Sequence, residues 1–295
     1  SRDDPNVIRT ILQNLILQQR ETEAITALTR MLAVAPENTE IRYLAGIAHE
    51  NIDELDTALA HFETIETDTR YYPNAAIHMA VIHYKQNNME KSITVLETAV
   101  KTVSDEEKIQ LIPYLASFYK EKDMTDEASS LISDGLDIEP GHPGLLYEKG
   151  VVYDMKGDKD MAMEQMRRVL AIDPDHADAL NYIGYTYAEQ GINLEEAEQL
   201  IIRALEIKPD NGYIIDSLGW VYFQKGRFEE ALIHLKRAAE LVPEDPIILE
   251  HLGDVYLKLD QSEKALEFYE RALGNKKKDL DGIQHKIDRL RHKEF

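Results

Sequence analysis

Small residues recur along the chain with a period of 34 to 36 positions, and we call the residues of this series the markers. A second, mostly small series lies twelve residues before each marker, and a bulky apolar series lies four residues after it. A fixed period of this length indicates stacked copies of a unit that cannot bury its apolar face alone, so the sequence predicts a solenoid. The markers are Ala24, Ala58, Ser92, Ala128, Ala162, Ala197, Ala231 and Ala265.

Within a unit, the apolar positions follow the spacing of an amphipathic helix. In the seventh unit one apolar stripe ends before Gly226 and a second begins after it. Prolines close several units, as expected where one helix has ended and the next begins. The pattern therefore predicts a helix, a tight turn and a second helix in each unit. The small residues mark the points where the paired helices cross, so a large side chain at Gly219 or Ala231 should cost about 1–3 kcal/mol by overpacking.

Three segments carry the repeat most clearly: LNYIGYTYA from Leu180, DSLGWVY from Asp216 and LEHLGDVY from Leu249. They resemble the tetratricopeptide repeat (TPR), and the resemblance extends over about residues 5–275. It implies an all-α fold, a right-handed α-solenoid of about eight helix-turn-helix repeats in an array that spans 1–275. The expected repeats are 5–36, 39–70, 73–104, 109–140, 143–174, 177–209, 212–243 and 246–275.

The two ends of the array differ. Residues 276–295 are charged except for one apolar stripe, Leu280, Ile283, Ile287 and Leu290, which predicts a C-terminal capping helix with its polar side outward. The first helix is apolar around too much of its circumference for a solvated cap, so we expect that further repeats precede it or that another chain covers it. Its candidate oligomer contact comprises Val7, Ile8, Ile11, Leu12, Leu15 and Ile16.

The charge balance narrows the classes of partner. The chain has 55 acidic and 33 basic residues and a formal net charge of -22. Such a chain repels nucleic-acid phosphates and anionic membrane surfaces, which argues against both as partners. It contains no cysteine, which excludes disulfides, thiol catalysis and thiolate metal sites. No run of about 20 apolar residues predicts a membrane span.

Candidate chemistry is scarce. The ten histidines have no partners at metal-ligand spacing. The acidic pairs Glu195–Glu196 and Glu229–Glu230 each open a second helix, where they complement the helix dipole. The glycines belong to the repeat and form no phosphate-binding loop. We therefore expect a protein that is not an enzyme and that uses no cofactor and no metal.

The resemblance implies that the first helix of each repeat lines a concave surface. The face left over by the core positions is aromatic and acidic. The phase of its single tryptophan, Trp220, favours a binding anchor, and packing against a neighbouring helix is the alternative. The acidic residues suit attraction of a basic partner or simple solvation. The candidate protein-binding residues are Tyr147, Asp154, Asn181, Tyr185, Tyr213, Asp216, Trp220, Phe223, Glu250 and Asp254.

Two functional hypotheses follow. The first is a non-catalytic adaptor or scaffold that binds a protein or extended peptide, basic or aromatic, in this groove. The segments at Asp216 and Leu249 resemble bacterial TPR lipoproteins of the outer membrane, which implies the periplasm, an anchor through a lipid signal upstream of Ser1, and recruitment of an envelope protease or peptidoglycan hydrolase. A cytoplasmic location is the alternative. The second hypothesis is a structural protein that self-assembles into a homo-oligomer through its apolar N-terminal helix.

Overall fold

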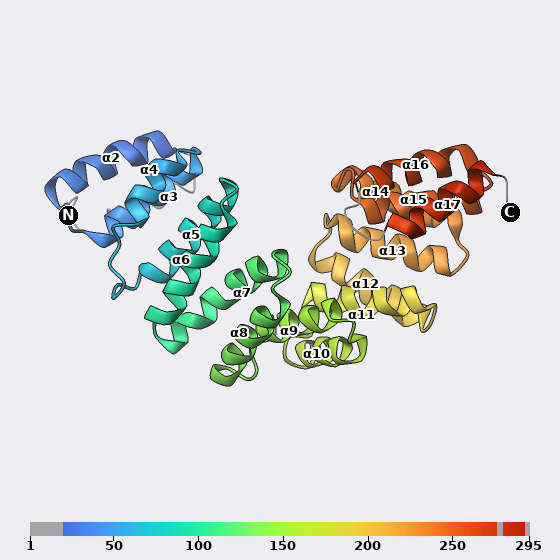
Figure 1. The fold of residues 1–295 in the computed structure, drawn as a ribbon, viewed down its shortest axis with the longest axis horizontal. Coiled ribbons are helices and arrows are strands. Elements are labelled where there is room, and N and C mark those ends of the chain that lie inside the picture. The colour runs from blue at the N-terminus through green and yellow to red at the C-terminus, as the bar shows by residue number, and fades with distance from the viewer. Residues whose placement is uncertain (1–19, 276–279, 293–295) are drawn as a thin grey trace. The chain divides into compact units, whose positions relative to one another are not determined.

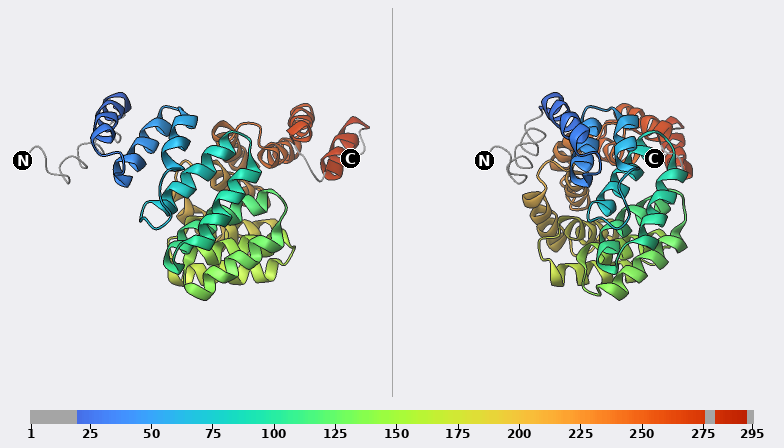
Figure 2. Two further views of the ribbon diagram at one scale, coloured as in Figure 1. Left: turned by 60° about the vertical axis from the view of Figure 1, so that its left-hand side comes forward. Right: turned by 90° about the vertical axis from the view of Figure 1, so that its left-hand side faces the viewer.

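The computed structural model describes residues 20–275 and 280–292. Within these residues the chain forms sixteen helices and no strand, which confirms the predicted all-α class. Within each compact unit, neighbouring helices pack side by side in successive antiparallel pairs (Figures 1 and 2). Of the helices in this described part, none combines the length and the hydropathy that a membrane span requires.

The chain divides into two compact units, unit 1 (Ser1–Asp158) and unit 2 (Lys159–Phe295). Unit 1 contains α2 (Glu21–Val34), α3 (Thr39–Asn51), α4 (Leu55–Phe62), α5 (Tyr72–Lys85), α6 (Met89–Thr102), α7 (Asp105–Glu121), α8 (Thr125–Ile138) and α9 (Pro143–Met155). Unit 2 contains α10 (Lys159–Ile172), α11 (Ala177–Gln190), α12 (Leu194–Ile207), α13 (Gly212–Gln224), α14 (Phe228–Leu241), α15 (Pro246–Lys258), α16 (Ser262–Asn275) and α17 (Leu280–Arg291).

The division falls inside an expected repeat. Repeat 143–174 contributes α9 to unit 1 and α10 to unit 2, whereas the other complete pairs lie within one unit. Of the first expected repeat, 5–36, only the second helix, α2, is described. The predicted oligomer contact lies outside the described residues and stays a prediction: Val7, Ile8, Ile11, Leu12, Leu15 and Ile16.

Within each unit, the turns inside the helix pairs contain residues in the left-handed region, one in most turns and two, Gly191 and Asn193, between α11 and α12. Glycine reaches this conformation at no steric cost, and Asp and Asn tolerate it. In unit 2, Gly226 (φ 73°) and Asp260 (φ 58°) stand 34 positions apart in equivalent turns. Polar caps then start several first helices: Asn211 accepts from the backbone N–H groups of Tyr213 and Ile214, and Asp245 does so for Ile247 and Ile248. Turn and cap chemistry therefore repeat with the same period as the core.

Small residues allow the paired helices to approach each other. The marker alanines, such as Ala197, Ala231 and Ala265, are fully buried. A methyl group added to Gly219 on α13 would lie 2.7 Å from Cγ of Leu235 on α14 and 3.3 Å from the backbone oxygen of Ala231. There is no room for it unless Leu235 shifts. The predicted close crossing at Gly219 and Ala231 is confirmed.

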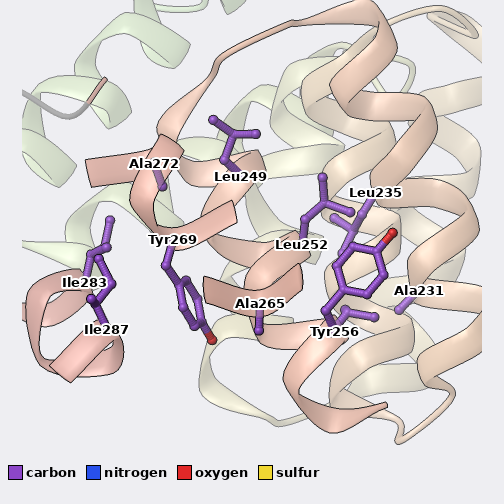
Figure 3. Packing of buried hydrophobic residues seen from close by; sticks show 11 residues of the cluster. Ala231, Leu235, Leu249, Leu252, Tyr256, Ala265, Tyr269, Ala272, Ile283 and Ile287 are labelled. Atoms are coloured by element: carbon purple, nitrogen blue, oxygen red, sulfur yellow. The ribbon is translucent and has the colours of Figure 1, made fainter. Parts of the chain in front are cut away.

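The end of unit 2 is covered by α17. Ile283 and Ile287 are buried in the same apolar cluster as Leu249 and Tyr269 (Figure 3), and Leu290 packs partly against it. These are three of the four residues of the predicted capping stripe. The helix begins at Leu280, whose side chain lies outside the description.

We expect Gly219→Ala to lower the unfolding midpoint, because an overpacking cost of about 1–3 kcal/mol exceeds the gain of roughly 1 kcal/mol in helix propensity. The matched control is Gly274→Ala on α16, where an added methyl group meets nothing within 4 Å. Urea unfolding followed by circular dichroism compares the two variants with the unsubstituted chain. Equal midpoints for both variants would contradict the close crossing.

Candidate protein-binding face of unit 2

The first helices of three successive pairs, α11, α13 and α15, pack against one another in unit 2. Gly184, Gly219 and Gly253 turn one side of these helices towards their second helices. Another side of these helices, which we call the first-helix face, begins six positions before each glycine, at Tyr213 on α13 and Ile247 on α15, and continues through the residues three positions before and one position after the glycine. They are Asn181 and Tyr185 on α11, Asp216 and Trp220 on α13, and Glu250 and Asp254 on α15.

A buried acid-histidine pair joins α13 to α15. Nδ1 of His251 lies 2.9 Å from Oδ1 and 3.1 Å from Oδ2 of Asp216. The two residues are 7% and 5% exposed, respectively. Asp216 was expected to face a partner, and the structure corrects this, because its carboxylate is enclosed and accepts a hydrogen bond from the neighbouring repeat.

The electrostatic surroundings of His251 favour its charged form. Burial alone would lower its pKa, because it removes water from the imidazolium. The carboxylate of Asp216, supported by those of Asp254 and Glu250, outweighs this effect and raises the pKa of His251 above its ordinary value. Asp216 and His251 therefore form a charge-assisted hydrogen bond across the repeat interface.

An aromatic stack lies beside this pair. The ring of Trp220 is 4.1 Å from the His251 ring at an interplanar angle of 17°, and 4.6 Å from the Phe223 ring at 9°. Tyr185 completes the cluster, 6.4 Å from His251. Burial raises the pKa of the Tyr185 phenol, and the charges of Asp216, Glu189 and Glu250 raise it further. Trp220 thus packs against His251 on the neighbouring first helix, α15, which is the alternative to a direct role in binding.

The other two acidic candidates are bound by a lysine of the capping helix. Nζ of Lys286 on α17 lies 2.9 Å from Oε1 of Glu250, and 2.7 Å and 2.8 Å from the carboxylate oxygens of Asp254. The Tyr269 hydroxyl donates to Oδ1 of Asp254 at 2.7 Å. Glu250 and Asp254 were expected to attract a basic partner. In the structure they already bind a cation of the same chain, Lys286 on α17.

The apolar side chains that this face leaves to solvent are Tyr213 and Ile247. They stand 34 positions apart at the start of α13 and α15, and they are 56% and 51% exposed. Phe223 is half-buried and also contacts Phe228, with 5.5 Å between their ring centroids. Tyr213 was a sequence candidate, whereas Ile247 was not selected although it holds the equivalent position in the next repeat.

Three predicted residues lie elsewhere or have a different environment. Tyr147 and Asp154 belong to α9 in unit 1, so they are not part of the first-helix face of unit 2. Asn181 is half-buried on α11, and its buried Oδ1 atom accepts no hydrogen bond from any described residue. Together with Tyr185, Tyr213, Asp216, Trp220, Phe223, Glu250 and Asp254, Asn181 forms the part of the predicted set that unit 2 carries.

Sequence reasoning missed the roles of His251 and Lys286. A signal for His251 was available, because it directly follows Glu250, which holds the position of Asp216 one repeat later. Unit 1 repeats this arrangement with His78, whose Nε2 lies 3.3 Å from the Tyr43 hydroxyl and whose Nδ1 lies 2.7 Å from Glu50. Burial raises the pKa of Glu50, but His78 and Lys85 outweigh it and lower the pKa overall.

The polar clusters offer no constellation for metal binding. No group of three or more His, Asp or Glu side chains in the described ranges could hold a metal ion. The chemistry that the first-helix face presents is instead apolar contact at Tyr213 and Ile247, beside internally paired charges.

Comparisons with known proteins agree with this architecture. A family model described as TPR repeat matches residues 219–260, and models described as tetratricopeptide repeat match residues 18–73, 143–176 and 248–279. The TPR repeat-containing protein PA4667 of Pseudomonas aeruginosa is 28% identical over 196 residues, which are 64% of this chain and 33% of that protein. TPR repeat-containing protein YpiA of Bacillus subtilis is 28% identical over 165 residues, which are 55% of this chain and 37% of that protein.

The chain spans about a third of the length of these curated relatives. Among solved structures, a tetratricopeptide repeat protein from Parabacteroides merdae superposes with a TM-score of 0.63 at 16% identity, over 85% of this chain and 98% of that one. At this identity the similarity concerns the fold.

The Asp216–His251 pair should make the stability of unit 2 depend on pH. Because the folded pKa of His251 is raised, its contribution is fully present below the ordinary histidine pKa of about 6.5 and is lost as the pH rises through the folded value. His251→Asn, which stays neutral, should therefore be most destabilising relative to the natural chain at about pH 6, and less so at about pH 9. Urea unfolding followed by the fluorescence of the single tryptophan, Trp220, measures this difference.

His285→Asn provides the matched control, because His285 is exposed on α17. Its effect on the unfolding free energy should be small at both pH values. A His251→Asn penalty that stays constant or grows with pH would show that the charged pair does not stabilise the interface.

Proposed function

The chain is a tetratricopeptide repeat protein, a class that generally mediates protein–protein interactions, and from this premise we propose that it is a non-catalytic adaptor. It binds an extended segment of a partner protein along the first-helix face of unit 2. The observation that carries the proposal is the pair of exposed apolar side chains, Tyr213 and Ile247, at equivalent positions of neighbouring repeats. Aromatic and aliphatic anchors held on rigid helices bury a large area at a small cost in entropy.

The charges beside these anchors support a specific kind of partner. Asp216 is paired with His251, and Glu250 and Asp254 are paired with Lys286. A basic segment would have to displace these internal cations, so it would gain little from the acidic residues. The partner segment is therefore aromatic or aliphatic at two positions that match the spacing of Tyr213 and Ile247.

The network beneath the anchors prepares the face for binding. His251 stacks on Trp220 and donates a hydrogen bond to the carboxylate of Asp216, which fixes α13 against α15 in both position and rotation. A partner then meets anchors at a preset separation, and it does not have to order the helices on binding. The same network explains why Trp220 supports the site without being its most exposed residue.

We extend the proposal to the bacterial envelope on the resemblance of the segments at Asp216 and Leu249 to outer-membrane TPR lipoproteins. In this setting the protein works in the periplasm and recruits a protease or a peptidoglycan hydrolase. Fractionation of the native cells with an antibody to the chain tests the compartment, and affinity capture names the partner. Recovery of the chain in the cytoplasmic fraction would overturn the envelope assignment and leave the adaptor role to be tested separately.

We expect Ile247→Asp to weaken binding of a peptide selected from a random library on the natural chain by about tenfold or more, because loss of a central anchor costs about 2 kcal/mol or more and about 1.4 kcal/mol is tenfold. Tyr213→Ala should have a similar effect. Fluorescence anisotropy with the labelled peptide gives the dissociation constants.

Ile233→Asp is the matched control. It introduces the same charge at an even more exposed isoleucine, 67% exposed against 51% for Ile247, but on α14, the second helix of its pair. Its binding should equal that of the natural chain. Loss of binding in Ile233→Asp with retention in Ile247→Asp would move the site from the first helices to the second helices.

A further inference from the structure

The helix α17 occupies the place next to α15 and α16 that the first helix of a following repeat would take. In unit 2 each first helix packs against the second helix of the preceding pair, as α13 does on α12 and α15 does on α14. In the same way, α17 packs against α16. The residues of its outer surface, such as Asp281, His285 and Asp288, are exposed. The inner surface of α17 therefore carries the interaction with the body of unit 2.

The contact has an apolar half. Ile283 and Ile287 are buried side by side against Leu249, Tyr269 and Ala272 (Figure 3). They lie one helical turn apart, so any amphipathic helix with two aliphatic residues at this spacing presents the same shape. This half selects a helix but does not specify which one.

The polar half is more specific. Lys286 stands between the two isoleucines on the same surface, and its ammonium group contacts Glu250 and Asp254 and lies 5.4 Å from the centre of the Tyr269 ring. Burial alone would lower the pKa of Lys286, but Asp254 and Glu250 outweigh it and raise the pKa. The cation thus stays charged in the contact.

Removal of that cation takes away the ion pairs that Glu250 and Asp254 make with α17. Glu250 and Asp254 lie one turn apart on α15, both largely shielded from water, and two like charges at this spacing repel each other. The Tyr269 hydroxyl supplies a hydrogen bond to Asp254 but no positive charge. A helix that replaces α17 restores these ion pairs only if it brings a cation of its own to the same point.

We propose that the groove formed by α15 and α16, with Glu250, Asp254 and Tyr269 at its centre, is a docking site for an amphipathic helix of a partner protein that carries a lysine between two aliphatic residues. In the isolated chain α17 occupies this groove as an intramolecular competitor. The evidence for the occupant is the charge and apolar complementarity that Lys286, Ile283 and Ile287 display. The groove is separate from the anchors Tyr213 and Ile247, and the proposal does not rest on the function assigned to them.

Uptake of a helix in trans tests the groove in the full chain. The probe is a fluorescent peptide of residues 280–292, measured by anisotropy. Lys286→Glu in the chain places a third carboxylate beside Glu250 and Asp254 and releases α17. We expect this chain to bind the probe about tenfold or more tightly than the natural chain, because the apparent dissociation constant scales inversely with the fraction of open groove. A probe that itself carries Lys286→Glu should not bind.

His285→Glu is the matched control, since it places the same negative charge at an exposed position of α17. It should bind the probe as weakly as the natural chain does. Ile283→Ser is a second way to release α17 that leaves every charge in place, and it keeps the test decisive if Lys286→Glu perturbs folding. Tyr213→Ala, combined with Lys286→Glu, should take up the probe normally even where it has lost the extended peptide.

The proposal is overturned if neither released chain binds the probe more tightly than the natural chain. It is also overturned if sedimentation shows that the natural chain dimerises by exchange of α17, because the groove would then belong to a second copy. Loss of the extended peptide in Tyr213→Ala together with normal helix uptake distinguishes failure of one site from failure of the other.

Discussion

The close crossing of two helices at a residue with little or no side chain is the constraint on which the other contacts depend. At Gly219, α13 approaches α14 until Leu235 fills the space that a methyl group would occupy. This crossing fixes the rotation of α13 about its axis and so decides which of its residues turn towards α11 and α15. Asp216 reaches His251, and Trp220 stacks on the same ring, because that rotation is fixed. The polar and aromatic network is thus a consequence of steric packing.

The same constraint explains how much of the molecule the sequence could predict. The period, the small residues and the buried stripe of α17 follow from apolar burial. Buried positions recur with the period of the helix, so they leave a clear pattern of apolar residues in the sequence. The partners of Asp216, Glu250 and Asp254 do not follow from it. Their charges are satisfied by His251 and Lys286, residues 32 to 36 positions away, and such contacts depend on the reach of long side chains across a repeat interface. Phase indicates which residues are near, but not which of them pair.

Charge has a structural role that the net value of -22 conceals. Cations repeatedly join one helix pair to the next: Lys156 to Asp126 in unit 1, and Lys159 to Glu189 and Lys225 to Glu198 in unit 2, with separations between 2.5 and 2.7 Å. Exposed pairs of this kind contribute little individually. Many of the basic residues nevertheless take part in such pairs, so the excess acidic residues face solvent. Some charged residues therefore hold neighbouring helix pairs in register, and others keep the protein in solution.

The left-handed turns have a practical consequence for anyone who modifies this protein. The turns inside the pairs are alike in backbone but not in residue, since Gly226 has an aspartate, Asp260, in its place one repeat later. An L-residue other than glycine holds that conformation at a cost that its local hydrogen bonds offset only in part. The turns inside the pairs follow the first helices, whereas Tyr213 and Ile247 stand at the starts of those helices. The turns are accordingly the positions where the stability of the array can be adjusted while these two anchors keep their recognition chemistry.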